Sequence, residues 1–325
     1  MQAMRTIGGC VIAACAATAV TTPASAQEYP SKPVRIILGF AAGGPNDLAT
    51  RGIGQKLQES LGQPFVVEPR PGANGLIAAE LVAKAPPDGY TLLTISSSFT
   101  INPSAYAKLP FDTLKDFAAV SPIAVGDILF VVNPVVPARS VKEFVALARS
   151  KPGKLNFASS GAGGTLHLGG ELLKQITGID IVHIPYKGAV PALTDVIAGH
   201  VDSMFVASPP AIPLIKANKI RALGVASAKR TPALPEVPTF DEAGYRNFEV
   251  DARYGIVAPA ATPAAVIGKL NEAIAKAVAS SDIKEKFAAF GLAPMHTSAS
   301  VYSNYLRADV EKWRKVVTAA KLPPQ

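Results

Sequence analysis

The chain of 325 residues has few of the residue types that define a catalytic or metal chemistry. Its two cysteines, Cys10 and Cys15, both lie near the N-terminus, so the rest of the chain has no disulfide, thiolate nucleophile or cysteine metal ligand. The four histidines show no metal-ligand spacing, and neither Gly-x-Ser-x-Gly nor His-Glu-x-x-His occurs. We therefore expect no metal, no cofactor and no catalytic residues.

The charge and the hydropathy of the chain also exclude several classes of protein. Charged residues make up 17% of the chain and the formal net charge is +8, but lysine and arginine form no basic stripe interleaved with aromatic residues. This pattern argues against a nucleic-acid partner and favours anionic solutes only weakly. Hydrophobic residues make up 49%, which is ordinary for a globular protein and excludes disordered and coiled-coil chains.

One apolar run, from Ile7 to Val20, stands at the N-terminus. Arg5 precedes it, and the small residues Ala24-Ser25-Ala26 follow it. This arrangement is typical of a secretory signal peptide, and the run is too short for a permanent membrane span. We predict a signal peptide over residues 1–26, cleavage after Ala26 and a periplasmic protein with a net charge of +7 once Arg5 is removed.

From Val34 onward, short apolar runs alternate with segments of helical periodicity. The runs show little in/out alternation, as do strands buried on both faces. This order predicts an α/β fold of parallel sheets with right-handed crossovers. The expected strands are Val34–Phe40, Phe65–Glu68, Tyr90–Ile95, Ile128–Val132, Leu155–Ala158, Ile181–Ile184, Val201–Val206, Arg221–Ala226 and Gly255–Ala258. The length suggests about two domains, and the only tryptophan, Trp313, is expected in the core of a C-terminal helix.

Two glycine-rich turns are candidates for anion binding. The first follows the opening strand over Gly39–Asp47, and the second follows a later strand over Ser159–His167. Each precedes a helical segment, where free backbone N–H groups and the helix dipole favour an anion. The first turn is neither a P-loop nor a dinucleotide fingerprint. A tight turn without ligand is the alternative for either one, but two such turns in separate halves predict two sites facing each other across a cleft.

A catalytic alternative rests on Ser160 and His167. This pair resembles half of a triad, but no carboxylate with a matching role is evident nearby, so an exported serine hydrolase is the competing hypothesis. His183 lies within an apolar strand and is expected to be a buried, hydrogen-bonded side chain.

Several further motifs carry a resemblance to a known family. They occur in order along the chain from Tyr29 onward, and together they resemble the Bug receptors, the solute-binding components of tripartite tricarboxylate transporters. The motifs are Tyr29–Arg35, Ala42–Gly44, Glu68–Ala73, Pro87–Leu92, Ile101–Pro103, Pro185–Gly188, Pro191–Asp195, Ser227–Arg230, Leu234–Thr239 and Ala258–Pro259.

The resemblance implies a type II periplasmic binding protein, in which two α/β lobes close over a small organic acid. It implies that the two glycine turns grip a ligand carboxylate and that segments 96–100, 185–188 and 205–208 line the rest of the cleft. The candidate ligand-binding residues are Phe40, Ala42, Gly43, Gly44, Asn46, Ser97, Ser98, Ser159, Ser160, Gly161, Gly164, Thr165, His167, Tyr186, Val206, Ala207 and Arg253.

Two departures from the family pattern bear on the ligand. Many relatives have Asp-Asn where this chain has Val206-Ala207, and losing that acid makes an amino-acid ligand less favourable. Relatives often have Trp where this chain has Arg253. If Arg253 faces the cleft, its guanidinium would take a second carboxylate through two parallel hydrogen bonds.

Together these inferences predict a monomeric periplasmic receptor for a dicarboxylate or aromatic acid. The lobes are expected over 27–127 plus 231–325 and over 128–230. Ligand would shift the population toward the closed state, and the partners would be the large and small membrane subunits of a tripartite transporter. A sensing partner of a membrane kinase is a further alternative.

Overall fold

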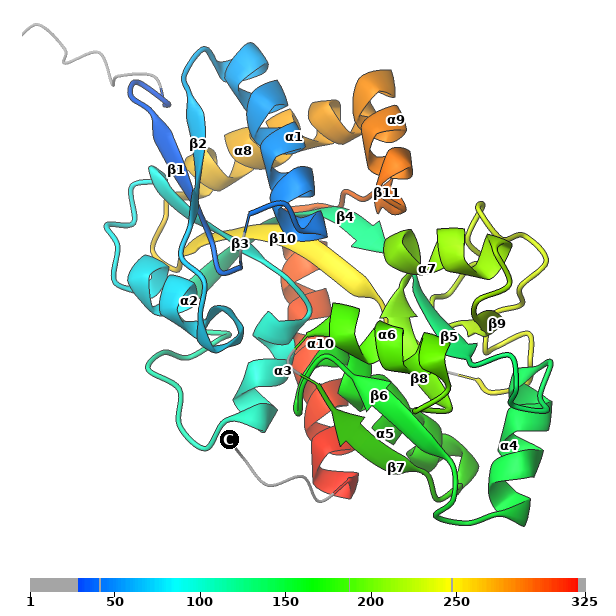
Figure 1. Ribbon diagram of the computed structural model, residues 1–325. Coiled ribbons are helices and arrows are strands. Elements are labelled where there is room, and N and C mark those ends of the chain that lie inside the picture. The colour runs from blue at the N-terminus through cyan, green and yellow to red at the C-terminus, as the bar shows by residue number, and fades with distance from the viewer. Residues whose placement is uncertain (1–28, 41, 187, 247, 321–325) are drawn as a thin grey trace, which may run out of the picture.

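The apolar runs of the sequence become the central strands of two separate sheets, one in each lobe (Figure 1). The computed structural model describes residues 29–40, 42–186, 188–246 and 248–320. The expected signal peptide over residues 1–26 lies outside the described residues.

The first lobe is built on a six-stranded sheet. Every residue of its inner strand β3 is buried because helices cover both faces of the sheet. In spatial order the strands are β11 (Leu292–Pro294), β4 (Phe117–Gly126), β10 (Ala252–Pro259), β3 (Thr91–Ile95), β1 (Val34–Leu38) and β2 (Phe65–Pro69).

The second lobe is built on a five-stranded sheet. Strand β5, which lies between β8 and β9, is buried throughout, whereas β7 lies at the edge, and half of its residues are exposed. In spatial order the strands are β7 (Val182–Pro185), β6 (Asn156–Ser159), β8 (Ser203–Ala207), β5 (Ile128–Val132) and β9 (Arg221–Val225).

Helices cover the faces of both sheets. Those of the first lobe are α1 (Pro45–Leu61), the short 3₁₀ turn η1 (Ala73–Gly75), α2 (Leu76–Ala83), α3 (Ser98–Ala105), α8 (Ala264–Ala279), α9 (Ser281–Ala289) and α10 (Ala299–Ala319). Those of the second lobe are α4 (Val141–Ser150), α5 (Thr165–Thr177), α6 (Ala189–Ala198) and α7 (Ser208–Lys216). In the part of the chain that the structure describes, no helix combines the length and hydropathy needed to cross a membrane.

The expectation of purely parallel sheets is wrong, because both sheets are mixed. In the second lobe β5 runs antiparallel to β8 and β9, and in the first lobe β10 runs antiparallel to β3 and β4. Strands β5 and β10 are the ones that the chain enters directly after crossing from one lobe to the other, whereas β11, which also runs antiparallel to β4, follows α9 within the first lobe. A strand reached by such a crossing has no helical connection to reverse its direction, so it need not follow the parallel rule.

The two crossings lie at Asp127, between β4 and β5, and just before β10. The segment 231–250 packs on the five-stranded sheet: Phe240 N donates to Val225 O, and Val250 N donates to Ala226 O. Phe240 also stacks within the aromatic core of that lobe. We therefore propose that the second lobe extends to about Val250 instead of ending at Arg230.

The C-terminal helix α10 links the lobes. It packs on α3 and β4 of the first lobe and also against α5 of the second (Figure 1). Trp313, expected in the core, is 2% exposed among residues of the second lobe, and its indole N–H donates to Asp309 Oδ2. This helix therefore contacts both lobes.

Candidate functional site

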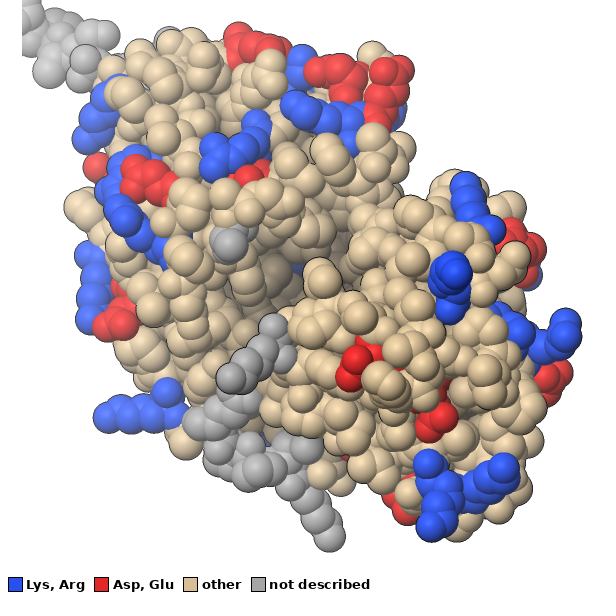
Figure 2. Space-filling view, viewed as in Figure 1, with Lys and Arg blue, Asp and Glu red and all other residues tan. Residues whose placement is uncertain are grey.

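Both glycine turns lie where a parallel strand ends and a helix begins. The first connects β1 to α1, the second connects β6 to α5, and both strands run toward the middle of the molecule (Figure 1). Figure 2 shows a hollow between the lobes whose visible walls are almost entirely uncharged, while charged side chains gather on the outer surfaces. A ligand held here would therefore meet backbone and neutral polar groups.

The first turn is held by the third residue of its helix. Gly43 N donates to Asp47 Oδ2 over 2.9 Å, and Asp47 Oδ1 pairs with Arg51 Nε over 2.8 Å. Gly43 has φ of +86°, which a residue with a side chain rarely adopts. Asp47 is 4% exposed, and its negative charge is balanced by Arg51.

The second turn repeats this geometry with a different side chain. Gly163 N donates to His167 Nδ1 over 3.0 Å, again from the residue before the N-cap to the third residue of the helix. The φ of Gly163 is +72°. The two N-cap glycines also agree: Gly44 has φ −79° and ψ 169°, and Gly164 has φ −84° and ψ 167°. Sequence reasoning found no internal repeat, yet the backbones of the two turns match.

This shared geometry leaves donors directed beyond each helix. Neither N-cap glycine has a side chain that could accept a hydrogen bond from the first N–H groups of its helix. The backbone N–H groups in the first turn of α1 and in the first turn of α5 therefore lack a side-chain cap. Pro45 removes one donor from the first site. The N–H groups that remain, with the helix dipole behind them, suit a carboxylate in each lobe.

Asn46 adds a side-chain donor to the first site. Its Oδ1 accepts a hydrogen bond from Thr94 Oγ1 over 2.8 Å, whereas its Nδ2 has no partner among the described residues although the side chain is 5% exposed. A buried amide donor without a partner is costly. Phe40, Ala42, Gly43 and Gly44 are all at least partly accessible beside it.

A segment that sequence reasoning missed adjoins the first turn. Ala73 and Asn74 both have positive φ, and the Cα of Gly75 lies so close to Gly39 that a Cβ on Gly39 would come within 2.7 Å of it. Residues 74–75 line a small cavity with Phe40. The Asn74-Gly75 pair is a turn signal that could have placed this segment.

The hydroxyls of Ser97, Ser98 and Ser159, three of the four predicted serines, are already hydrogen-bonded within the protein. Ser97 Oγ donates to Asp251 O over 2.9 Å and accepts from Arg253 N over 3.0 Å, so this hydroxyl ties α3 to the second crossing. Ser98 Oγ lies 2.8 Å from Ser96 Oγ. Ser159 is fully buried, whereas Ser160, Gly161, Gly164 and Thr165 remain partly accessible.

The remaining predicted residues divide between core and surface. Val206 is fully buried in the second lobe, whereas Ala207 is partly accessible. The hydroxyl of Tyr186 donates to Asp195 Oδ2 over 2.6 Å, and this bond raises the pKa of the phenol to about 12. The phenol of Tyr186 therefore stays neutral at pH 7.

Arg253 lies in an ion-pair cluster at the second crossing. Its Nε and Nη2 face the two carboxylate oxygens of Asp251, Nη2 also lies 3.0 Å from Glu249 Oε1, and the guanidinium stacks on Tyr305 at 4.0 Å. The Nε/Nη2 edge of the guanidinium, which could bind a ligand carboxylate through two parallel hydrogen bonds, is thus paired with Asp251. Burial and the neighbouring Asp251 raise the pKa of Glu249. Whether Arg253 also contacts a ligand stays a prediction, but this placement favours a structural role.

We expect Arg253→Ala to reduce the free energy of unfolding by about 2 kcal/mol at pH 7, because it leaves two carboxylates without their cation. The loss should shrink as the pH falls toward 5, where protonation relieves their repulsion. Urea unfolding at both pH values, with calorimetric ligand titration, measures this. An unchanged stability with a large loss of affinity would instead favour direct ligand binding by Arg253.

The hydrolase hypothesis is wrong, because His167 is not available as a base for Ser160. Its Nδ1 accepts from Gly163 N, and its Nε2 lies 3.7 Å from Glu171 Oε1. Burial opposes ionisation of Glu171, but bonds from His167 and Lys174 outweigh it and lower the pKa of this carboxyl. A general base needs a free nitrogen within reach of the nucleophile, and neither ring nitrogen is free.

His183 makes the stability pH-dependent. Burial, followed by the charge of the neighbouring His167, lowers its pKa from 6.5 to about 4. As the pH falls, the unfolded chain therefore binds this proton before the folded protein does. The contribution of His183 to the free energy of unfolding is full above about pH 6.5 and is lost as the pH falls to about 4. For a partly accessible ring the loss is about 2 kcal/mol. Urea unfolding across this range should show a shallower pH slope for His183→Gln than for the wild type. Equal slopes would contradict this.

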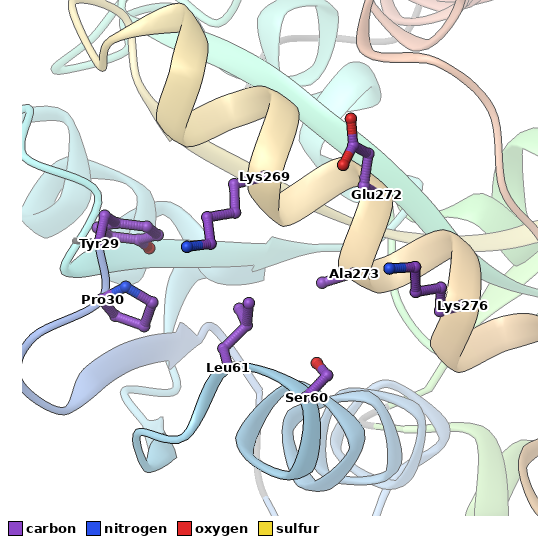
Figure 3. A pocket seen from close by; sticks show the side chains of 8 residues that line it. All are labelled: Tyr29, Pro30, Ser60, Leu61, Lys269, Glu272, Ala273 and Lys276. Carbon is purple, nitrogen blue, oxygen red and sulfur yellow. The ribbon is translucent and has the colours of Figure 1, made fainter.

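A second hollow lies far from the turns (Figure 3). This cavity of about 380 Å³ lies between the end of α1 and α8, and Lys269 points across it toward Tyr29. Its charged side chains, Lys269, Glu272 and Lys276, lie near the surface. Within the described ranges, no group of three or more His, Cys, Asp or Glu side chains is placed to hold a metal ion.

The two mixed sheets and the turns that face a hollow define a periplasmic binding protein fold. The chain belongs to the TctC family, described as the tripartite tricarboxylate transporter family receptor, and the model of this family matches residues 49–322. The Bug resemblance is confirmed. The chain is 35% identical over 311 residues to protein BugT of Bordetella pertussis, which covers 94% of this chain and 95% of BugT. This is a family of binding proteins for transport and not of enzymes.

Solved structures agree. A Rhodopseudomonas palustris protein solved with adipate is 34% identical, with a TM-score of 0.79 over 92% of this chain and all of that one. MatC from Rhodopseudomonas palustris, solved with bound malate, is 31% identical with a TM-score of 0.75, covering 89% and 100% of the two chains. The periplasmic binding protein BugD is 30% identical with a TM-score of 0.76, covering 91% and 100%.

Proposed function

We propose that this receptor captures a small organic dicarboxylate between its lobes and delivers it to the membrane subunits of a tripartite transporter. The observation that carries the proposal is the matched pair of turns, one in each lobe, each offering uncapped N–H groups at a helix start. A dicarboxylate engages one turn with each end. After export and cleavage behind Ala26, the protein would act in the periplasm.

The relatives support this ligand class. Adipate and malate, with which two of them were solved, are both dicarboxylates. The absence of an acid at Val206 and Ala207 gives an ammonium group no partner at this strand end, so an amino acid such as aspartate would leave a buried charge unpaired. Dicarboxylates are therefore favoured over amino acids.

Lobe closure follows from the placement of the two turns. In the open state the ligand binds one lobe, and only one of its carboxylates has hydrogen-bond donors. In the closed state both carboxylates are bound, and the carbon chain of the ligand is also removed from water. The difference in interaction between the two states is what shifts the population toward closure. The crossings at Asp127 and near Asp251 are the segments about which the lobes would rotate.

A matched ligand panel tests the proposal. We expect adipate or malate to bind at least about tenfold more tightly than a monocarboxylate of the same length, such as hexanoate for adipate, because the monocarboxylate leaves one turn unused. Isothermal titration calorimetry measures the affinities, and the unfolding midpoint should rise with the tighter ligand. Benzoate and aspartate complete the panel. Equal binding of mono- and dicarboxylates would contradict a two-turn grip.

A further inference from the structure

A partly buried cluster of polar side chains lies directly behind the second glycine turn. His183 on β7 is its centre, opposite Phe157 of β6 in the strand register. The groups that face it are Phe157, Ser159, His167, Glu171 and Lys174. The ligand proposal uses the outer side of this turn and assigns no role to His183.

His183 reaches the first half of the turn through Ser159. Its Nε2 lies 2.6 Å from Ser159 Oγ. The same hydroxyl lies 2.9 Å from Gly161 O and accepts from Gly161 N over 3.2 Å. All three bonds are satisfied together only if His183 Nε2–H donates to Ser159 and Ser159 donates to Gly161 O. Gly161, with φ of +147°, is thereby bonded through both of its backbone polar groups.

The same ring reaches the second half of the turn through His167. The two imidazoles stack with centroids 3.7 Å apart and planes at 17°. His167 in turn accepts from Gly163 N, so the position of its ring sets the direction of that N–H. A single side chain on β7 therefore contacts the groups that hold both Gly161 and Gly163.

We propose that His183 is a positioning residue, whose bond to Ser159 and stack on His167 hold the second turn in the shape that binds a carboxylate. This rests on the proposed function, since the turn must be a ligand site for its shape to affect affinity. The first turn has no equivalent, because Asp47 is braced by Arg51 instead. The neutral ring is suited to this place, since a charge stacked on His167 would be unfavourable.

The test distinguishes the effect of the His183–Ser159 hydrogen bond from the effect of the ring stacking between His183 and His167. His183→Phe keeps an aromatic ring against His167 but removes the bond to Ser159, His183→Gln keeps a side-chain N–H donor, and Ser159→Ala removes the hydroxyl. His200→Gln, which replaces a histidine that is 72% exposed in the same lobe, is the control. Each variant is measured by malate and adipate titration and by the amide resonances of Gly161 and Gly163 in the ligand-free protein.

We expect His183→Phe and Ser159→Ala each to weaken binding about tenfold and to shift the Gly161 amide. The double variant should be little weaker than either single one, because both act through one bond. His183→Gln should recover part of the affinity, and the control should match the wild type. Additive losses, or a Gly161 amide that does not move in either variant, would overturn the proposal.

One readout depends neither on a variant that folds nor on a ligand that binds. In the wild type, ¹⁵N shifts of the imidazoles should show the proton of His183 on Nε2, and a proton on Nδ1 instead would overturn the bond chain. If the wild type binds no carboxylate, the proposed function fails, whereas the amide and imidazole resonances still decide whether His183 positions the turn.

Discussion

Replacing Asp47 with alanine should weaken dicarboxylate binding by about ten- to a hundredfold, the effect of losing one to two hydrogen bonds. The carboxylate holds Gly43 N at the start of α1 and is itself braced by Arg51. Without it, Gly43 loses the bond that stabilises its positive φ, and the N–H groups of the first turn are no longer aligned for a ligand. Calorimetric titration with malate and adipate measures the loss.

The control for this prediction is Arg51→Ala. It removes the ion pair but leaves the bond from Gly43 N to Asp47, so affinity should fall much less. A purely electrostatic view predicts the opposite for Asp47→Ala, since removing a negative charge beside an anion site would strengthen binding. Tighter binding by a folded Asp47→Ala variant would therefore show that this turn does not act through its shape.

Replacing Phe240 with alanine should lower the free energy of unfolding by about 3–5 kcal/mol, the usual cost of a large buried aromatic. Phe240 is fully buried, stacks on Phe248 at 3.9 Å between centroids, and contacts Phe130 and Phe205. It anchors the segment 231–250 to the second lobe. Urea unfolding of the ligand-free protein gives the value.

Phe290→Ala is the matched control, because this phenylalanine is only half-buried, against the core of the first lobe. It should cost clearly less than Phe240→Ala. A loss below about 1 kcal/mol for Phe240→Ala would contradict the docking of residues 231–250 on the five-stranded sheet, and with it the placement of the second crossing near Asp251.

Local sequence was enough to predict the parts of the site that local chemistry determines. The run Val34–Phe40 followed by Gly43-Gly44-Pro45 predicts a strand, a tight turn and a helix start, and the structure has these elements in this order, with the strand over Val34–Leu38. The strand predicted over Leu155–Ala158 is likewise found over Asn156–Ser159, before the second turn. Glycine, proline and β-branched runs act over a few residues, so their effect is visible without the fold.

Other features depended on contacts between distant segments. Ser97 is a candidate ligand-binding residue, and the structure shows that its hydroxyl bonds to backbone groups more than 150 residues away. Arg253 looked like a candidate ligand for a carboxylate, but Asp251 and Glu249 neutralise it. His183 appeared to be a satisfied core histidine, and the pairing of β6 with β7 gives it a place behind the turn.

The sequence by itself therefore determined the α/β class, the two glycine turns and the family, because each is written in short motifs and periodicity. Only the tertiary structure decided that the sheets are mixed, that the two turns share one backbone geometry, and which polar side chains are already paired. The scarcity of cysteine and of metal-ligand spacing argued against metal and thiol chemistry, but it left both a serine hydrolase and the binding chemistry open. Backbone N–H groups carry no signature in the sequence, and only the fold brings them to face a common space.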